Sequence, residues 1–383
     1  MFRFYAPCTL GLEPALAAEL QALGATEVEP HAGGVGFAGD ARLGLRANLW
    51  LRSAIRVQQE VLACAAPSTD AVYAAVRDLP WEGLLRLDQT LAVDAVVRDS
   101  AITHSQYLAL RIKDAVVDRF RDRFGARPNI DPDDPDLPLR AVLRRDRLLL
   151  YRDWSGTSLH KRGWRPIQVK SPLNESIAAG LLLLAGWDRS GGLVDPMCGS
   201  GTLVVEAALL AADMAPGLRR RFACERFGDL EPGLMRALRA EAQARVRTKV
   251  DVSLEGADRH PGALAIARRG ADAAGVGHLV RFVHAEVARY TPSFPPAYVF
   301  VNPPYGERIG EGEDLVQSWR DLGAFLRARC PGAQAYVLSG DPGLTRHLGL
   351  RSTQRWPVHN GPIECRLVRY DVRAAAAPEA PLP

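Results

Sequence analysis

The sequence lacks the features of an exported, membrane-spanning or metal-binding protein. Its longest run without a polar side chain, residues 177–187, has 11 residues, whereas a helix that spans a membrane needs about 20. No two of the six cysteines are separated by only two residues, so neither a disulfide framework nor a zinc site is expected. The first residues show no basic leader followed by an apolar segment. We therefore expect a cytoplasmic protein that binds no metal.

Lysine is scarce as well, because it supplies only four of the 48 basic residues and arginine supplies the rest. The net charge of +4 is too small for a protein that coats nucleic acid through charge alone. The basic residues nevertheless gather in two regions. Residues 140–170 hold nine basic and two acidic residues, and residues 214–250 hold nine basic and four acidic residues. These two regions are candidates for contact with a nucleic-acid backbone.

The 383 residues are enough for two or three domains, since a domain averages about 150 residues. Residues 1–60 predict a strand, a helix and further short strands, and residues 61–155 predict an α+β domain that ends in a β-hairpin. A linker follows at 156–172. Between 173 and 372 apolar strands alternate with helices, which is typical of a parallel, doubly wound α/β sheet. The Ala/Pro-rich residues 373–383 are expected to be disordered.

Six strands are expected in the second half of the chain, at residues 193–195, 252–257, 280–283, 298–301, 335–338 and 366–371. The segment 173–184 predicts a strongly apolar helix before the first of them. In the first half, the segment 128–136 is rich in proline and aspartate and predicts a loop. Ligands of a doubly wound sheet bind at the carboxyl ends of its strands, so the residues after each strand are the candidate site.

The first of these strand ends, Leu-Val-Asp-Pro-Met-Cys-Gly-Ser-Gly-Thr at residues 193–202, predicts an acidic residue, a glycine turn and a helix start. Glycines let a ligand approach the backbone, and a helix N-terminus favours an anionic group. A dinucleotide fingerprint would need a third glycine where Val204 stands, and a phosphate loop would need lysine. S-adenosylmethionine, which has an adenosine and one carboxylate, fits better. We assign its contacts in this motif to Asp195, Pro196, Cys198, Gly199, Gly201 and Thr202.

Acidic residues follow the next two strands. Asp258 closes the strand at 252–257, where a carboxylate can accept both ribose hydroxyls of the cofactor; a helix-capping role for Asp258 remains an alternative. Glu286 follows the strand at 280–283, where an acid can accept the adenine amino hydrogens. Cys198 is expected to pack in the cofactor loop rather than to attack a pyrimidine ring, because it does not lie in the substrate loop.

The fourth strand is followed by Asn302, Pro303, Pro304 and Tyr305, which we predict to be the catalytic residues. An exocyclic amine on a heteroaromatic ring is a poor nucleophile, so the enzyme must position it. The Asn302 side-chain oxygen and the Pro303 carbonyl are expected to accept its two hydrogens. The Pro-Pro step fixes the backbone that carries these acceptors, and Tyr305 offers a ring on which the base can stack. Asn302 is also expected to border the cofactor.

Two basic segments are candidates for RNA contact. The linker contains Lys161, Arg162, Trp164 and Arg165, which mix cations with an aromatic ring. An insertion after the first motif contains Arg219, Arg220 and Arg221. A solvated linker with a buried Trp164, and a solvated helical face around Arg220, remain the alternatives.

At these motifs the chain resembles the bacterial 23S ribosomal RNA guanine-N2 methyltransferases that carry an RNA-binding THUMP domain. The resemblance covers about residues 3–372. It rests on the motifs named above and on the following further positions: Leu12, Glu13, Leu16, Glu19 and Leu20, residues 129–135, Leu-His-Lys-Arg-Gly at 159–163, Ala-Pro-Gly-Leu at 215–218, residues 302–308 and Asn-Gly-Pro-Ile-Glu-Cys at 360–365.

The resemblance implies a ferredoxin-like domain at 1–60, a THUMP domain at 61–155 and a Rossmann-like class I methyltransferase domain at 173–372. It implies that this last domain has seven strands, with an antiparallel last strand. It also implies S-adenosylmethionine as cofactor and the N2 amino group of a guanine in 23S ribosomal RNA as substrate. Glu286 departs from the family, which has aspartate more often there. Some members fuse a second methyltransferase after this one, and only the guanine reaction is expected here.

Three other functions remain open at this point. Transfer RNA is an alternative substrate, and a DNA adenine methyltransferase would share residues 302–305. A catalytically inactive RNA-binding factor in ribosome assembly belongs to a different class. The sequence does not indicate which guanine is modified or the oligomeric state.

Overall fold

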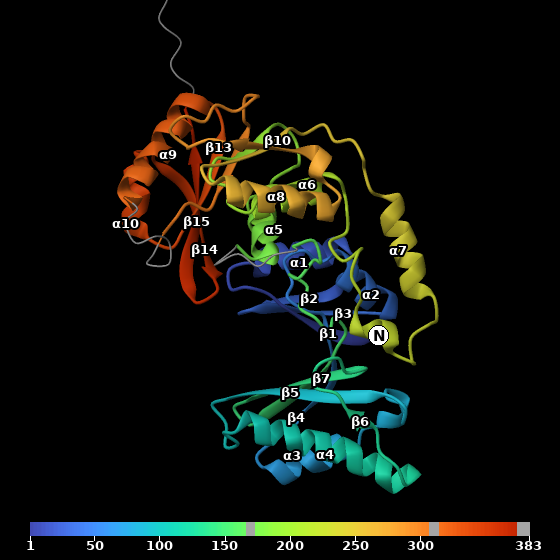
Figure 1. Cartoon of the computed structure of the whole chain (residues 1–383). Coiled ribbons are helices and arrows are strands. Elements are labelled where there is room, and N and C mark those ends of the chain that lie inside the picture. Colours follow the sequence, from blue (N-terminus) through green and yellow to red (C-terminus); the bar gives the residue numbers. More distant parts are fainter. Residues whose placement is uncertain (166–172, 306–313, 374–383) are drawn as a thin grey trace, which may run out of the picture. The chain divides into compact units, whose positions relative to one another are not determined.

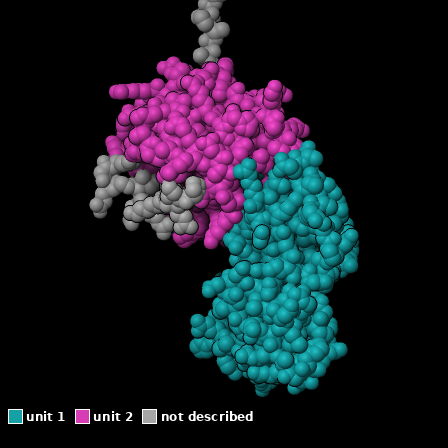
Figure 2. Space-filling view, turned by 45° about the vertical axis from the view of Figure 1, so that its right-hand side comes forward, with its two compact units in different colours: residues 1–8, 16–159, 217–244 teal, residues 9–15, 160–216, 245–383 magenta. Residues whose placement is uncertain are grey.

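The structure is a computed structural model that describes residues 1–165, 173–305 and 314–373 (Figure 1). The predicted disordered tail lies outside this range apart from residue 373. The chain divides into two compact units (Figure 2). Unit 1 comprises residues 1–8, 16–159 and 217–244, and unit 2 comprises residues 9–15, 160–216 and 245–383. Among the described residues, no helix is both long enough and apolar enough to cross a membrane.

Unit 1 is built on one eight-stranded sheet with the order β2-β3-β1-β4-β8-β7-β5-β6. Its strands are β1 (Phe2–Pro7), β2 (Thr26–His31), β3 (Gly34–Gly39), β4 (Gln58–Ala65), β5 (Thr90–Arg98), β6 (Asn129–Ile130), β7 (Leu137–Arg144) and β8 (Arg147–Asp153). The strand β4 pairs with both β1 and β8 and so joins the two predicted amino-terminal domains into one sheet. The prediction of a loop throughout 128–136 is wrong in one detail, because β6 pairs with Thr90 and Leu91 of β5.

The helices of this half of the chain are α1 (Glu13–Ala22), α2 (Ala41–Trp50), α3 (Thr69–Arg77) and α4 (Ser105–Phe124). Two of them, α2 and α3, begin at a side-chain cap. Asp40 caps α2 by accepting from the Leu43 N–H at 2.7 Å. In α4 the buried residues Leu108, Ile112, Val116 and Phe120 recur at every fourth position, so one stripe of the helix is apolar. This stripe lets α4 pack against α3 and β5.

The basic insertion belongs to unit 1, although the chain reaches it from unit 2. Its helix α7 (Leu234–Ala244) packs against α2, and Arg42 pairs with Glu241 at 2.5 Å. The buried Arg152 of β8 makes two hydrogen bonds to Asp229, at 2.8 and 2.7 Å. These contacts join residues more than 70 positions apart, which no local sequence pattern could show.

Unit 2 contains a seven-stranded sheet with the order β11-β10-β9-β12-β13-β15-β14. Its strands are β9 (Leu193–Asp195), β10 (Leu254–Asp258), β11 (Val280–His284), β12 (Tyr298–Val301), β13 (Gln334–Ser339), β14 (Ser352–Asn360) and β15 (Ile363–Asp371). The pairs from β11 to β13 are parallel, and β15 is antiparallel to both β13 and β14. This confirms the predicted doubly wound α/β sheet of seven strands with an antiparallel last strand.

The helices of unit 2 are α5 (Glu175–Leu184), α6 (Thr202–Ala211), α8 (Pro261–Ala274), α9 (Leu315–Arg329) and the short α10 (Pro342–Thr345). The helices α6 and α8 both pack against β10 and β11. The sequence did not predict β14, which is one of the two edge strands of the sheet. Most of its side chains are partly or fully exposed, and it contains Pro357. An edge strand tolerates proline and needs no apolar alternation, so it carries little sequence signal.

Candidate active site

The strand β9 ends at an acidic residue, Asp195, and a turn follows it. Asp195 is only 2% exposed, and one of its oxygens accepts from the Met197 N–H at 3.1 Å. Burial, and to a smaller extent the neighbouring Asp258, raises the pKa of Asp195 well above its usual range. The Cys198 N–H donates to the Ala257 carbonyl at 2.8 Å, which ties the turn to the adjacent strand β10.

The two glycines of this turn have conformations that other residues rarely adopt. Gly199 has φ +54° and Gly201 has φ +79°, both in the left-handed region. A Cβ on Gly201 would come within 2.9 Å of the Ala267 Cβ, whereas a Cβ on Gly199 would meet no atom within 4 Å. Gly201 is the N-cap of α6 and provides no side-chain cap. The backbone therefore leaves open space at Gly199 beside the first N–H groups of a helix, which suits an anionic ligand.

Asp258 lies at the end of β10 and contacts the same turn. One carboxylate oxygen accepts from the Gly199 N–H and the other from the His260 N–H, both at 2.8 Å. His260 is the N-cap of α8, and that helix has no side-chain cap, so Asp258 holds the residue before the helix and does not cap the helix itself. Each carboxylate oxygen can accept more than one hydrogen bond. These backbone contacts therefore hold the carboxylate beside the glycine turn and leave it able to accept ribose hydroxyls.

Glu286 follows β11 at the same edge of the sheet. Asp258 and His284 are paired across the parallel strands β10 and β11, and the Ala285 N–H donates to the Asp258 carbonyl at 3.1 Å. The Glu286 side chain is exposed. Its position therefore agrees with an adenine contact, but its role stays a prediction.

The Asn-Pro-Pro-Tyr segment follows β12, which pairs with β9 in parallel. Because the carboxyl ends of parallel strands lie at one edge, Asn302 and the glycine turn belong to the same edge of the sheet. The Asn302 Oδ1 is buried and has no hydrogen-bond partner among the described residues. Trp319 holds the segment by donating from its indole N–H to the Pro304 carbonyl at 2.9 Å. A buried acceptor without a partner costs free energy, so this oxygen is suited to a donor from a ligand.

The ring of Tyr305 is held by residues that the sequence analysis did not assign to the site. Tyr305 is 8% exposed, and its hydroxyl accepts from the Asn360 Nδ2 at 2.9 Å and lies 3.6 Å from the Cys365 Sγ. A Cβ on Gly340 would approach the ring to 2.9 Å. Burial raises the pKa of Tyr305 above its usual range. Residues 360–365 appeared in the sequence only as part of a family pattern, and no spacing signal connects them to Tyr305.

Cys198 is buried, and this burial raises the pKa of its thiol well above its usual range. A thiol that stays protonated is a poor nucleophile. The structure therefore supports the expectation that Cys198 packs in the cofactor loop, where its Sγ lies close to Gly256 of β10.

Two of the predicted RNA-binding residues of the linker are buried, and for them the prediction is wrong. Arg162 pairs with Glu206 of α6 at 3.3 Å, with side chains that are 2% and 0% exposed. Trp164 is 4% exposed and packs on Gly270 of α8. A buried arginine must be paired, so these side chains attach the linker to unit 2 instead of reaching RNA.

Arg165 is also engaged within unit 2. It donates to the Thr202 Oγ1 at 2.7 Å and pairs with Glu175 at 3.1 Å. Lys161 is exposed, as are Arg219 and Arg221 in unit 1. Arg220 is half-buried and donates to the Ser158 carbonyl at 2.8 Å. For these four cations, contact with RNA remains a proposal.

Comparison with known proteins identifies three segments. Residues 162–369 match the family model described as "RMKL-like, methyltransferase domain". The chain belongs to this methyltransferase family. Residues 3–58 match the RlmL ferredoxin-like domain, and residues 66–153 match the THUMP domain. The resemblance inferred from the sequence motifs is thereby confirmed, together with the order of its three domains.

Two curated relatives of the chain carry the name ribosomal RNA large subunit methyltransferase K/L. The relative from Syntrophotalea carbinolica is 42% identical over 99% of this chain and 56% of its own length. The relative from Allochromatium vinosum is 40% identical over 96% of this chain and 51% of its own length. The chain thus spans about half the length of the curated relatives it matches.

Solved structures agree on the fold. SMU.472, whose crystal structure contains SAH, superposes with a TM-score of 0.90 at 26% identity over 98% of this chain and 99% of its own. A protein from Listeria monocytogenes, described as a predicted N6-adenine-specific DNA methylase, superposes with a TM-score of 0.88 at 30% identity over 97% of this chain and 96% of its own. The methyltransferase family and the class I fold confirm S-adenosylmethionine as the predicted cofactor.

Proposed function

We propose that this protein transfers a methyl group from S-adenosylmethionine to the N2 amino group of a guanine in 23S ribosomal RNA. The names of the curated relatives support ribosomal RNA as substrate, and the THUMP domain supports RNA binding. The single observation that carries the proposed chemistry is the buried Asn302 Oδ1, which has no partner among the described residues. The choice of guanine N2 rests on the family resemblance of the sequence motifs.

The residues present fit the cofactor. The open space at Gly199 and the uncapped start of α6 would hold its carboxylate, Asp258 its ribose, and Glu286 its adenine. Asp195, Pro196, Cys198, Gly201 and Thr202 shape this turn. When bound, S-adenosylmethionine supplies a methyl group attached to a positively charged sulfur.

The chain's own groups orient the amine. The Asn302 oxygen and the Pro303 carbonyl would each accept one amine hydrogen, which directs the nitrogen lone pair away from them. Pro303 and Pro304 restrict the backbone torsions of both acceptors, and the buried Tyr305 ring supports the base. No general base is required, because the nitrogen becomes acidic only after it is methylated and can then lose its proton to water.

The test is methyl transfer by the purified full chain to nucleic acids from a strain that lacks the enzyme. We expect labelling of deproteinised 23S ribosomal RNA, with N2-methylguanosine as the product found by mass analysis of nucleosides. Lys161, Arg219, Arg220 and Arg221 are proposed to contact the RNA backbone, so replacing them with alanine should raise KM without lowering kcat. Labelling of transfer RNA alone would contradict the proposed substrate and would identify transfer RNA as the substrate instead.

A second outcome concerns DNA. One structural neighbour is described as a predicted DNA methylase, and an amine on adenine would fit the same acceptors. Formation of N6-methyladenine in DNA, lost on treatment with DNase, would contradict the proposal.

The variant Asn302→Ala distinguishes the proposed enzyme from the alternative, a non-catalytic assembly factor. We expect turnover to fall by a factor of about 10² or more, since each aligned acceptor in such a site is worth several kcal/mol, while the affinity for S-adenosylmethionine changes less than twofold. If the variant restores ribosome assembly in the deletion strain as well as the wild type does, the catalytic assignment fails.

A further inference from the structure

One face of the sheet in unit 1 carries a depression that is lined by strand and loop residues of the described chain. The strand register shows that Tyr5, Gln58, Tyr151 and Arg140 point to the same side, because Tyr5 pairs with Gln58, Glu60 with Tyr151, and Tyr151 with Arg140. The alternating residues on the other side are buried, as Phe4, Leu139 and Leu150 show. A Cβ on Gly44 of α2 would lie 2.7 Å from the Phe4 ring. The helix α2 therefore packs on the second side. The first side, which we call the open face, is lined at its surface by strand and loop residues, among which Gln58 and Tyr151 are buried by their neighbours.

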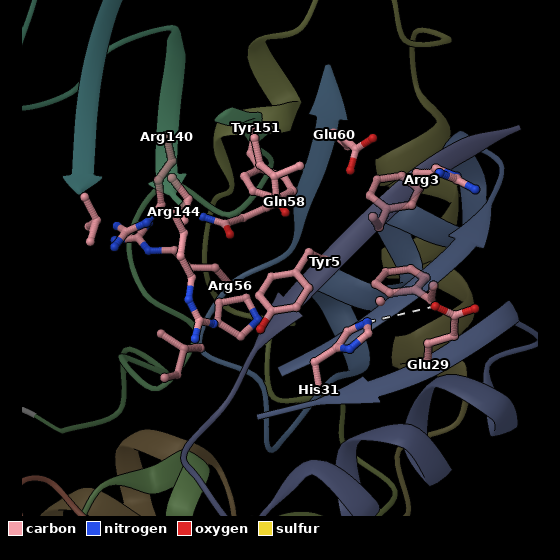
Figure 3. Close-up of a pocket in the computed structure, with 18 of the residues that line it drawn as sticks. Arg3, Tyr5, Glu29, His31, Arg56, Gln58, Glu60, Arg140, Arg144 and Tyr151 are labelled. Atoms are coloured by element: carbon pink, nitrogen blue, oxygen red, sulfur yellow. Dashed lines mark ion pairs between the residues drawn. The ribbon is translucent and has the colours of Figure 1, made fainter. Parts of the chain in front are cut away.

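The open face is hollowed. A depression of about 960 Å³ crosses it, and its lining residues come from seven strands of the sheet and from the adjoining loops. Figure 3 shows Tyr5 and His31 near its middle in this view, with Arg56, Arg140 and Arg144 on one side and Glu60 and Arg3 on the other. The half formed by β7 and β8 is therefore cationic.

The strongest feature of this half is a row of arginines on adjacent strands. Arg144 is paired across the sheet with Arg98 on one side and with Arg147 on the other. All three are exposed, and we call them the arginine row. Like charges on directly opposed residues destabilise a sheet, so such a row is unfavourable unless an anion lies over it.

Nearby carboxylates leave most of this charge unneutralised. Arg98 approaches Asp99 at 3.8 Å with both side chains exposed, whereas Arg144 and Arg147 form no ion pair within the described parts of the chain. In the hairpin turn, Asp146 accepts from the Ala101 N–H at 2.7 Å. In the depression, Arg140 pairs with Asp94 at 2.9 Å and Arg56 pairs with Asp153. The glutamates of the open face, Glu27, Glu29 and Glu60, lie on β2 and β4.

We propose that the open face of unit 1 binds a single-stranded segment of the RNA substrate, with its phosphates over the arginine row and a nucleotide against Tyr5. This inference rests on the proposed function in taking RNA as the substrate. Arginine matches the geometry of phosphate oxygens, and consecutive phosphates would separate the opposed charges of the row. A single strand suits the surface because its bases are free to stack on an aromatic side chain, whereas a duplex presents mainly backbone. Tyr5 is half-buried, which fixes its ring in place.

The test compares two double variants of the full chain that remove the same charge. Arg144→Ala with Arg147→Ala removes two members of the arginine row. Arg121→Ala with Arg123→Ala removes two exposed arginines from α4, on the covered side of the sheet. Fluorescence anisotropy measures binding of a single-stranded RNA oligonucleotide and of an RNA duplex of equal length over a range of salt concentrations.

We expect the row variant to lose at least tenfold in affinity for the single strand and the α4 variant to lose less than twofold. The slope of log affinity against log salt should fall in magnitude by about 1.4, because each phosphate contact on a single strand contributes about 0.7. Ultraviolet crosslinking should attach RNA to the peptide that contains Tyr5. Equal losses in both variants, unchanged affinity in the row variant, or a preference for the duplex would each overturn the inference.

The inference and the proposed function can fail separately. A wild-type chain that binds the oligonucleotide through the row but methylates no ribosomal RNA would contradict the function alone. A chain that methylates ribosomal RNA while the row variant binds and reacts like the wild type would contradict the open-face inference alone. If the row variant binds RNA normally but no longer retains a protein from ribosomal particles, the face is a protein-binding surface and the inference is wrong.

Discussion

Among single residues, Asp258 and Asn302 differ in their hydrogen bonding. The protein supplies donors to the carboxylate of Asp258, but the described residues supply none to the side-chain oxygen of Asn302. Both oxygens of Asp258 accept backbone N–H groups, so this carboxylate is oriented before any ligand binds. The Asn302 oxygen is buried with no partner among the described residues. The oriented carboxylate of Asp258 is what a cofactor would need, and the unpartnered oxygen of Asn302 is what an amine would need.

We predict that Asp258→Ala weakens binding of S-adenosylmethionine by a factor of about 10 to 100, because a hydrogen bond to a charged group is worth about 1.5–3 kcal/mol. Calorimetric titration of the full chain measures the affinity. Asp258→Asn keeps an acceptor for the Gly199 N–H and should lose less. The matched control is Asp251→Ala, an exposed aspartate before the same strand. An unchanged affinity in Asp258→Ala would remove this residue from the cofactor site.

Among the secondary-structure elements, the hairpin of β14 and β15 contacts the Asn-Pro-Pro-Tyr loop that follows β12. Asn360 ends β14 and Cys365 lies in β15, and both contact the hydroxyl of Tyr305. The sequence predicted that Tyr305 carries the base, but it assigned no function to the hairpin. The contact exists because β15 and β13 place the hairpin beside the loop that follows β12.

We predict that Asn360 is a positioning residue that acts through Tyr305. Asn360→Ala should lower kcat about fivefold, in line with about 1 kcal/mol for the lost hydrogen bond, and leave cofactor affinity unchanged. In a Tyr305→Phe background, which already lacks the hydroxyl, Asn360→Ala should have no further effect. Single-turnover methylation by the four proteins of this double-mutant cycle measures the coupling. Additive losses would show that Asn360 does not act through Tyr305.

The linker segment gives a second prediction at the scale of elements. Arg162→Ala should lower the free energy of unfolding of the full chain by about 3–5 kcal/mol, because it leaves Glu206 buried without its partner. Arg162→Met combined with Glu206→Leu should recover most of this loss, since an apolar pair can replace a buried ion pair. Urea unfolding measures both. A stable Arg162→Ala chain with weaker RNA affinity would restore the original prediction that Arg162 contacts RNA.

In the whole molecule, segments that follow one another in the chain do not always belong to the same compact unit. The segment 217–244 lies between motifs of the methyltransferase domain in sequence, but it packs within unit 1. Arg152 of β8 secures it through Asp229 and through the ring of Phe227, whose centroid lies 3.5 Å from the guanidinium carbon. Trp154 adds an edge contact to Phe227 with ring centroids 6.0 Å apart.

We predict that Arg152→Met loosens this segment together with β8 and leaves the sheet of unit 2 unchanged. Hydrogen exchange measured by mass spectrometry should show faster exchange in residues 222–230 and in β8, because the methionine keeps the apolar contact but leaves Asp229 without its partner. Peptides from β9 to β13 should exchange as in the wild type. Faster exchange in unit 2 instead of unit 1 would contradict the assignment of this segment to unit 1.

Local sequence patterns were enough to predict the parallel sheet, the glycine turn after β9 and the Asn-Pro-Pro-Tyr loop after β12. These features depend on local patterns: apolar strands, glycines at positive φ and a rigid Pro-Pro step. Three features became visible only in the folded chain: the burial of Arg162 and Trp164, the contact of Asn360 with Tyr305, and the row of three arginines across β5, β7 and β8. Each of these depends on pairing between residues far apart in the chain, and burial and register are properties of such pairs, which a pattern along one strand or helix does not contain.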